Sequence, residues 1–289
     1  MLALSISRSV QHLTGAPKPV NLRVLAVFDR ACDLVAPGGQ VVALVTPDIG
    51  DGPFNIVVEA HVGEWSSIEP GTPAQIQASV LRLSGMQITL TQAIAWEPRP
   101  DWNALRQQRA AISRHLPQLQ ATVQATSTEG LLVSLEETTG TGTDLEKALY
   151  AGWQGDLAQL QRAAKGLAGL GQGLTPAGDD FLCGLMLRAW LAHPAPREFC
   201  REIAQAAAPR TTTLSAAFLR AASRGECSAA WHELLYALAC DADEGLDQAA
   251  RNVLAYGETS GADTLAGFLY AAYLAGDFSN ERLQPGAQK

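Results

Sequence analysis

Two neighbouring carboxylates at the start of an apolar run are the residues of this chain best suited to chemistry. Asp179 and Asp180 follow a turn-forming segment, residues 173–178, and precede the helix-prone stretch 181–192. This order predicts a loop that leads into a helix, where free backbone N–H groups and the helix dipole favour anions. Adjacent carboxylates repel each other unless a cation, a proton or several donors accompany them. The pair is therefore a candidate substrate or metal site, and ordinary capping with an acidic first turn is the alternative.

A second loop near the end of the chain echoes the first. Residues 257–263 read Gly-Glu-Thr-Ser-Gly-Ala-Asp, so hydroxyls and glycines again lead to a carboxylate. Helix capping explains this loop as well as a binding role does. Two such loops nevertheless predict one composite site. Its candidate catalytic groups are Asp179, Asp180 and Asp263, and its candidate substrate-binding residues are Thr175, Gly178, Thr259, Ser260 and Gly261.

A third segment combines hydroxyls with arginine. Thr211, Thr212 and Ser215 stand at an expected helix start, and Arg220 lies further along the same helix. Hydroxyl and N–H donors at a helix N-terminus suit an oxyanion, and they suit a dianionic phosphate better than a neutral ligand. The alternative is plain capping, with an arginine that lies along the surface.

The overall composition limits the class of protein. The chain has 289 residues, 47% hydrophobic and 17% charged, with a net charge of −8. A nucleic-acid-binding surface would need a basic face, so that class is disfavoured. Five scattered cysteines without a Cys-x-x-Cys pair indicate neither a disulfide framework nor structural zinc, and they favour a cytoplasmic setting. The five histidines show no metal-ligand spacing, and the longest apolar stretch is too short to span a bilayer.

The secondary structure that must position these residues falls into two parts, one β-prone and one helical. The first hundred residues are β-prone and punctuated by Pro and Gly, which predicts a small antiparallel sheet or barrel, with a hairpin at Ser84-Gly85. The strands are expected at residues 21–28, 40–46, 54–60, 80–83 and 86–91.

Beyond residue 100 the chain reads as mostly helical. Asp101 is an expected N-cap, as is Asp144, and residues 125–143 are expected to form a loop around a short segment, 131–135. Helices are expected at residues 102–124, 144–168, 179–193, 196–208, 212–224, 228–240, 244–256 and 262–275. The prediction is an α+β fold with a β-rich domain over 1–100 and a larger helical domain over 101–277 that carries the three loops. The polar end from Asp277 onward is expected to fray, with 278–289 as a flexible tail.

Three motifs make the chain similar to a bacterial family long labelled only as a domain of unknown function. They are the Gly-Leu-Thr-Pro-x-x-Asp-Asp loop at 173–180, the Thr-Thr-x-x-Ser segment with its Leu-Arg-x-Ala continuation at 211–225, and the Gly-x-Thr-Ser-Gly-x-Asp-Thr-Leu-x-Gly loop at 257–267. Residues 27–31 and 50–53 match the N-terminal part of the family pattern. The resemblance covers nearly the whole chain.

That family includes AllH, a subunit of the oxamate carbamoyltransferase of anaerobic allantoin degradation. The resemblance implies a transferase subunit in purine catabolism that works in a hetero-oligomer with an FdrA-like subunit and a second companion. The reaction interconverts oxalurate and phosphate with oxamate and carbamoyl phosphate. In the third loop this chain has Glu258 where the AllH pattern has His. This difference leaves open whether the chain takes part in the same reaction and whether oxamate is its acceptor.

Three functions remain open from the sequence. The leading hypothesis is a carbamoyltransferase subunit in which the Thr-Thr-x-x-Ser helix start holds phosphate or carbamoyl phosphate, and the Asp179–Asp180 loop orients the acceptor or a cation. The second is a stand-alone hydrolase or transferase whose acidic loops bind Mg²⁺, the one cofactor that the residues suggest. The third is a non-catalytic partner subunit whose loops are interface elements.

Overall fold

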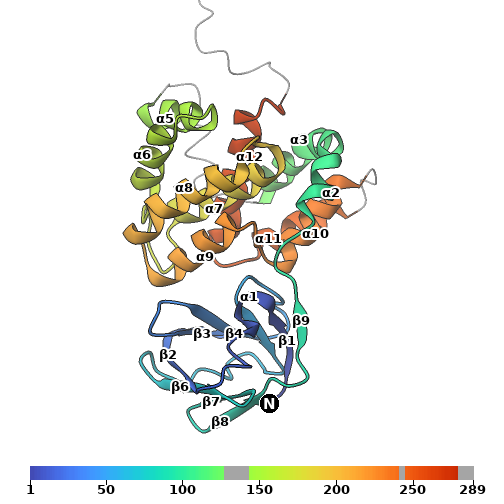
Figure 1. Ribbon diagram of the computed structural model, residues 1–289. Helices are drawn as coiled ribbons and strands as arrows, with labels where there is room; N and C mark the ends of the chain where they lie inside the picture. Colours follow the sequence, from blue (N-terminus) through green and yellow to red (C-terminus); the bar gives the residue numbers. More distant parts are fainter. Residues whose placement is uncertain (127–142, 241–244, 279–289) are drawn as a thin grey trace, which may run out of the picture. The chain divides into compact units, whose positions relative to one another are not determined.

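The computed structural model describes residues 1–126, 143–240 and 245–278. Its contacts divide the chain into two compact units, residues 1–100 with 227–229, and residues 101–226 with 230–289. The first unit is built on a sheet and the second on helices (Figure 1). The predicted α+β class, with a β-rich part followed by a larger helical part, is confirmed.

The first unit is a curled half-barrel of nine strands. The strands lie side by side in the order β8-β7-β6-β2-β3-β4-β5-β1-β9. All pairings are antiparallel except β4–β5 and β1–β9. The elements are β1 (Ala3–Ser7), α1 (Arg8–Gln11), β2 (Val20–Val27), β3 (Ala31–Val35), β4 (Val41–Val45), β5 (Asn55–Val58), β6 (Pro73–Gln77), β7 (Val80–Leu83), β8 (Met86–Thr89) and β9 (Ile94–Trp96).

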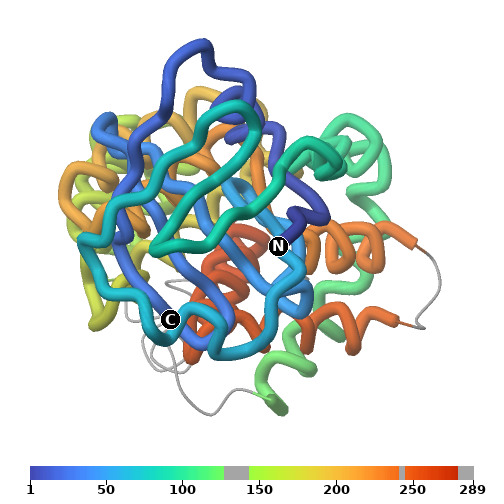
Figure 2. The backbone as a smooth tube through the Cα atoms, turned by 90° about the horizontal axis from the view of Figure 1, so that it is seen from below, coloured from blue at the N-terminus to red at the C-terminus, as the bar shows by residue number. Residues whose placement is uncertain are grey.

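The start of the chain joins the edge strand β8 to β1, the second strand from the other edge. Leu2, just before β1, forms a parallel bridge with Thr89 at the end of β8. The Thr89 N–H donates to the Met1 carbonyl at 3.1 Å, and the Met1 ammonium donates to the Gln87 carbonyl at 3.0 Å. In Figure 2 the dark-blue start of the chain lies beside the teal end of the sheet. The curl encloses an apolar core that includes Leu34.

The predicted hairpin at Ser84-Gly85 is confirmed. Both residues have positive φ, 49° and 82°, as a two-residue hairpin turn requires. Leu83 pairs with Met86 across the turn. The strands β1, β3, β6 and β9 were not predicted, because they are short or interrupted by polar residues and give a weak alternation; β9 has only three residues.

The Gly-Asp-Gly-Pro segment at residues 50–53 shapes the end of the sheet. Ser5 Oγ donates to Asp51 Oδ1 at 2.5 Å, and Ser7 Oγ donates to the Pro53 carbonyl at 2.7 Å. Asn55 Nδ2 donates to the Gly50 carbonyl at 2.9 Å. These bonds link the segment to β1 and β5, so this family motif has a structural role.

The second unit is helical. None of the described helices is both long and apolar enough to cross a bilayer. The helices are α2 (Trp102–Gln107), α3 (Arg109–Thr126), α5 (Asp144–Trp153), α6 (Leu157–Leu167), α7 (Ala177–Ala192), α8 (Pro196–Ala207), the short 3-10 turn η1 (Ala208–Arg210), α9 (Thr213–Ser223), α10 (Ala229–Ala239, whose first residue clusters with the sheet unit), α11 (Leu246–Leu254) and α12 (Ser260–Leu274).

Two of the predicted helices are each two helices in the structure. The one expected over 102–124 is interrupted at Gln108, which ends α2. The one expected over 144–168 is interrupted at Gly155, whose φ of 108° leaves the helical region. Asp156 then caps α6 by accepting from two of its N–H groups at 3.1 Å. Pattern alone missed these breaks because the apolar periodicity continues across them.

The predicted cap at Asp101 is confirmed, and the one at Asp144 is wrong. Asp101 Oδ1 accepts from the N–H groups of the first turn of α2 at 3.1 and 3.0 Å. Asp144 is the first residue of α5, and Thr143 caps that helix through a capping box with Glu146. The segment 131–135 lies outside the described residues.

Asp277 does not belong to a frayed end, contrary to the prediction. Its carboxylate binds the guanidinium of the fully buried Arg188. Arg109 lies 3.1 Å from Asp277 Oδ1, and Ser113 Oγ donates to the same oxygen at 3.0 Å. The ion pair could not be predicted from position in the chain, because the partners are 89 residues apart. Residues 279–289 lie outside the described part.

Candidate functional site

The helices α7 and α12 pack backbone against backbone. A Cβ on Gly184 would lie 1.7 Å from the carbonyl oxygen of Thr264, and one on Gly267 would lie 1.9 Å from that of Phe181. Real Cβ atoms do not approach so closely, so only glycine fits at either position. The two helices, which carry the first and third loops at their N-termini, are thereby held at a fixed separation.

The two helices run in the same direction with their N-termini together. Thr175 Oγ1, just before α7, lies 3.0 Å from Ser260 Oγ at the start of α12. Gly178 and Gly261 each sit against a carbonyl of the preceding helix, where a Cβ would lie 2.1 Å from the oxygen. The sequence echo Gly-x-Asp-x-Leu-x-Gly therefore marks equivalent positions on two parallel helices, and Asp180 and Asp263 are its equivalent carboxylates.

Asp179 is a bridging residue. It is fully buried, and its Oδ1 accepts from the Gly169 N–H at 3.2 Å. Its Oδ2 accepts from Thr211 Oγ1. The N-cap position of α7 is Pro176, which makes no side-chain capping bond. Asp179 thus joins the turn after α6 and the Thr-rich segment to α7, which is a different arrangement from a solvated acidic first turn.

Asp180 is a buried carboxyl that favours its protonated form. It is 6% exposed. Burial raises its pKa to about 8, a hydrogen bond from Ser260 opposes the rise, and the charges of Asp263 and Asp179 add to it. Within the described residues its Oδ2 has no hydrogen-bond partner. Asp180 can therefore carry a proton at neutral pH and present an oxygen that the surrounding protein does not use.

The Thr-rich segment is joined to the first loop. Thr212 is the N-cap of α9: its Oγ1 accepts from the Ser215 N–H at 3.0 Å and donates to the Leu174 carbonyl. Ser215 is buried. Together with the contact between Thr211 and Asp179, this bond brings the second and first loops together. Two of the hydroxyls predicted to bind phosphate therefore already make bonds inside the protein.

Replacement of Thr212 by valine is expected to destabilise the protein by about 1–2 kcal/mol, because the helix cap and the bond to Leu174 are both lost. Thr213→Val is the matched control, since Thr213 is the exposed first residue of α9. Its expected change is below about 0.5 kcal/mol. Urea unfolding of both variants measures the difference, and equal midpoints would contradict the capping role.

Some predicted residues lie elsewhere. Arg220 is exposed in the last turn of α9, at the opposite end from Thr212. Thr259 holds the N-cap position of α12 without a side-chain capping bond, and Glu258 beside it is exposed. The described residues contain no group of three His, Cys, Asp or Glu side chains arranged to share a metal ion. The magnesium hypothesis therefore has no ligand cluster in this part of the chain to support it.

Sequence reasoning missed two residues of this site. Gly169 supplies an N–H to Asp179, and nothing in its local sequence marks it. Cys183 is buried one turn after the carboxylates, and burial, followed by the charges of Asp180 and Asp179, raises the pKa of its thiol. Its spacing from Asp179 and Asp180 on a helix was the available signal.

Two of the histidines, His115 and His193, have structural roles. His115 Nδ1 lies 2.9 Å from the Leu238 carbonyl. His193 Nδ1 accepts from the Ala195 N–H at 3.1 Å, and its Nε2 lies 3.1 Å from the Trp153 carbonyl. Burial lowers the pKa of His193, so the neutral ring fits this role.

Comparison with protein families gives two matches, and both concern one family. The model of the AllH family N-terminal domain matches residues 2–95, which contain the sheet except for Trp96 at the end of β9. The model described as oxamate carbamoyltransferase subunit AllH matches residues 167–272, which contain all three loops. No solved structure matches the chain. The two family matches together cover most of the sequence, and the chain belongs to the AllH family of oxamate carbamoyltransferase subunits.

Proposed function

We propose that this chain forms part of the active site of a carbamoyltransferase that interconverts oxalurate and phosphate with oxamate and carbamoyl phosphate. The observation that carries the proposal is the meeting of the three loops at the buried Asp179–Asp180 pair. Hydrogen bonds join positions 32, 38 and 85 residues apart in the sequence. A structural role for one helix cap would not require all three loops to converge on buried carboxyls.

The reaction needs a proton at a defined place. A phosphate oxygen attacks the carbamoyl carbon of oxalurate, the C–O bond forms, and the bond from that carbon to the oxamate nitrogen breaks. An amide nitrogen is a poor leaving group unless it receives a proton as it departs. In the reverse direction the same proton must leave the oxamate nitrogen as it attacks carbamoyl phosphate.

Asp180 is suited to supply that proton. Its pKa of about 8 keeps the carboxyl protonated at neutral pH, yet close enough to ionisation for the group to act as a base in reverse. We assign it as the general acid, with Asp179 as a positioning residue through Gly169 and Thr211. Asp263 lies near enough for its charge to raise the pKa of Asp180.

The anionic parts of the substrates are assigned to the helix starts. The N-termini of α7 and α12 lie together, so their backbone N–H groups and dipoles favour negative charge at one place. Thr175 and Ser260 supply hydroxyls there, and Gly178 and Gly261 allow the close packing. The remaining predicted phosphate ligands, Thr211, Thr212, Ser215 and Thr259, are proposed to shape this region rather than to contact phosphate alone. Arg220 has no part in this assignment.

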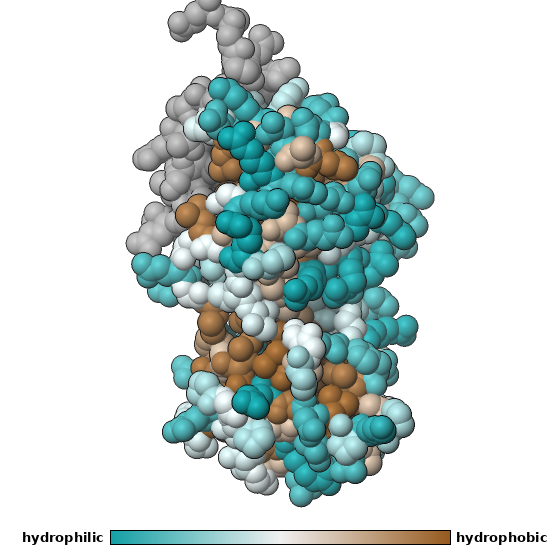
Figure 3. Space-filling model, turned by 60° about the vertical axis from the view of Figure 1, so that its left-hand side comes forward, coloured by the Kyte–Doolittle hydropathy of each residue, from teal (hydrophilic) through white to brown (hydrophobic). Residues whose placement is uncertain are grey.

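The proposal also needs partner subunits, as the description of the family implies. The sheet unit exposes large apolar side chains, including Phe28 at 46% and Val62 at 65%. Figure 3 shows apolar residues gathered on the surface of this unit. Exposed apolar patches of this kind are typical of surfaces that bind other proteins. An FdrA-like subunit and a second companion are the proposed partners.

The test is a reconstitution of the chain with its companion subunits. The assembled enzyme is expected to form carbamoyl phosphate from oxalurate in a phosphate-dependent manner, and omission of this chain is expected to abolish the reaction. Full activity of the companion subunits without it would make this chain dispensable and would refute the assignment.

A second candidate is a non-catalytic partner subunit. It is favoured by the internal bonds of Thr211 and Thr212, which use groups that the phosphate hypothesis would need. The two roles differ in the effect of Ser260→Ala on the assembled enzyme. The catalytic role predicts a higher KM for phosphate with assembly intact, whereas the interface role predicts loss of assembly.

A further inference from the structure

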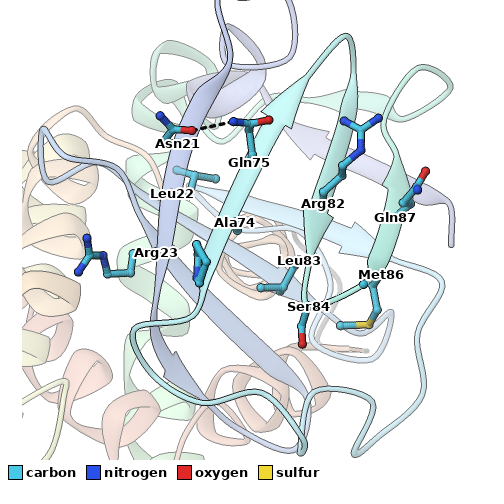
Figure 4. A pocket seen from close by; sticks show the side chains of 12 residues that line it. Asn21, Leu22, Arg23, Ala74, Gln75, Arg82, Leu83, Ser84, Met86 and Gln87 are labelled. Atoms are coloured by element: carbon cyan, nitrogen blue, oxygen red, sulfur yellow. Dashed lines mark hydrogen bonds between the residues drawn. The ribbon is translucent and has the colours of Figure 1, made fainter.

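The outer face of the strands β2, β6, β7 and β8 is hollowed into a groove of about 510 Å³ (Figure 4). A polar row crosses all four strands along it. Asn21 stands opposite Gln75, Gln75 opposite Arg82, and Arg82 opposite Gln87. Residues opposite each other on neighbouring strands project from the same face of a sheet. The groove therefore offers amide and guanidinium groups side by side.

Two arginines of the groove have uncompensated charges. Arg23 and Arg82 are both exposed, and the ion pairs and side-chain hydrogen bonds formed within residues 1–126, 143–240 and 245–278 involve neither of them. Elsewhere in this unit, Arg30 pairs with Asp48 at 3.1 Å. Two unpaired cations in one groove of a chain with net charge −8 favour an acidic ligand.

The spacing of the two arginines favours an extended ligand. Arg23 stands opposite Pro73 and Arg82 opposite Gln75, so they are two strands and two residues apart. This separates their Cα atoms by about 12 Å. Figure 4 shows the two side chains on either side of Gln75 and pointing away from each other. A single phosphate or carboxylate cannot pair with both, whereas a chain with several carboxylates can.

We infer that this groove binds an acidic, extended segment of a partner subunit. Guanidinium groups pair with carboxylates through two parallel hydrogen bonds, which gives orientation as well as attraction. Gln75 Nε2 donates to Asn21 Oδ1 at 2.8 Å, and this bond fixes the orientation of two amides between the arginines. Because the rest of the chain is acidic on balance, such a groove also determines where an acidic partner can dock. This site is separate from the proposed chemistry.

The first experiment uses the full chain and a fluorescein-labelled peptide of alternating glutamate and serine. Fluorescence anisotropy at low salt is expected to show binding that the Arg23→Ala/Arg82→Ala double variant weakens about tenfold. The matched control is Arg30→Ala, which removes an exposed arginine outside the groove and is expected to leave the affinity unchanged. A peptide with glutamine in place of glutamate is expected not to bind.

Several results would overturn the inference. Equal peptide affinity of the double variant and the wild type would place binding elsewhere. Binding of inorganic phosphate that competes with the peptide and disappears in the double variant would identify a small-anion site instead. The same double variant is expected to bind the companion subunits about tenfold more weakly while its unfolding midpoint stays unchanged; unchanged assembly would also count against a partner site.

Discussion

Substitution of alanine for Gly184 is expected to destabilise the helical unit by more than about 3 kcal/mol. The new methyl group would lie 1.7 Å from the Thr264 carbonyl oxygen, so α7 and α12 would have to move apart along the whole contact. The obstacle is backbone rather than a mobile side chain, and small rotations cannot relieve it. Gly267→Ala, with a 1.9 Å approach to Phe181, is expected to have a similar effect. Urea unfolding followed by circular dichroism measures both.

Gly166→Ala is the matched control for this prediction. Gly166 lies in α6, and a Cβ there would meet no described atom within 4 Å. The same substitution is expected to stabilise the protein by about 0.5–1 kcal/mol, because alanine favours helix more than glycine does. If Gly184→Ala unfolded at the same urea concentration as Gly166→Ala, the backbone contact between α7 and α12 would be refuted.

Asp180→Asn is expected to stabilise the protein, and the gain is expected to grow with pH. Asp180 has its pKa raised from 3.8 to about 8, chiefly by burial, so the folded protein binds a proton that the unfolded chain releases in this range. The wild type therefore loses stability as pH rises from about 4 to about 8, by as much as about 1.4 kcal/mol per pH unit. The asparagine mimics the protonated carboxyl and does not titrate, so the difference levels off above pH 8.

The stability of Asp180→Asn must be compared with that of the wild type at each pH, because Asp33 also has a pKa raised by burial, to about 7. Its contribution is common to both proteins and cancels in the difference. Asp179→Asn is the control, and its expected sign is opposite. It is expected to destabilise by about 1–3 kcal/mol, because Asp179 accepts bonds from Gly169 and Thr211 that an amide cannot fully replace. A stability difference between Asp180→Asn and the wild type that does not vary with pH would contradict the raised pKa.

The carboxylates and hydroxyls of the candidate site could be selected from the sequence because they lie in distinctive local patterns, whereas Gly169 could not. Asp179 and Asp180 follow a Thr-Pro turn and precede an apolar run, and both turn out to be buried in the first turn of α7. Their different roles could not be predicted. The donors of Asp179 are Gly169 and Thr211, which only the fold brings near. The pKa of Asp180 depends on the same packing.

The fold could be predicted at the level of class and not of detail. Strong local signals, such as Ser84-Gly85 and the cap at Asp101, identified elements that exist. The burial of Asp277 depends on a tertiary contact with Arg188, and the local pattern pointed the other way. The break at Gly155 has a local cause, a glycine with positive φ followed by the capping Asp156. Gly184 and Gly267 carry no local signal of their role, which is to allow the close approach of the backbones of α7 and α12.

The most direct test of the central claim is the rate of carbamoyl transfer by the assembled enzyme when this chain carries Asp180→Asn. The variant cannot give or take the proton, so kcat for carbamoyl phosphate formation from oxalurate is expected to fall about 10²–10⁴-fold. Assembly with the companion subunits is expected to be unchanged. A wild-type kcat in a fully assembled variant enzyme would show that Asp180 is not the proton donor and would contradict the proposed site.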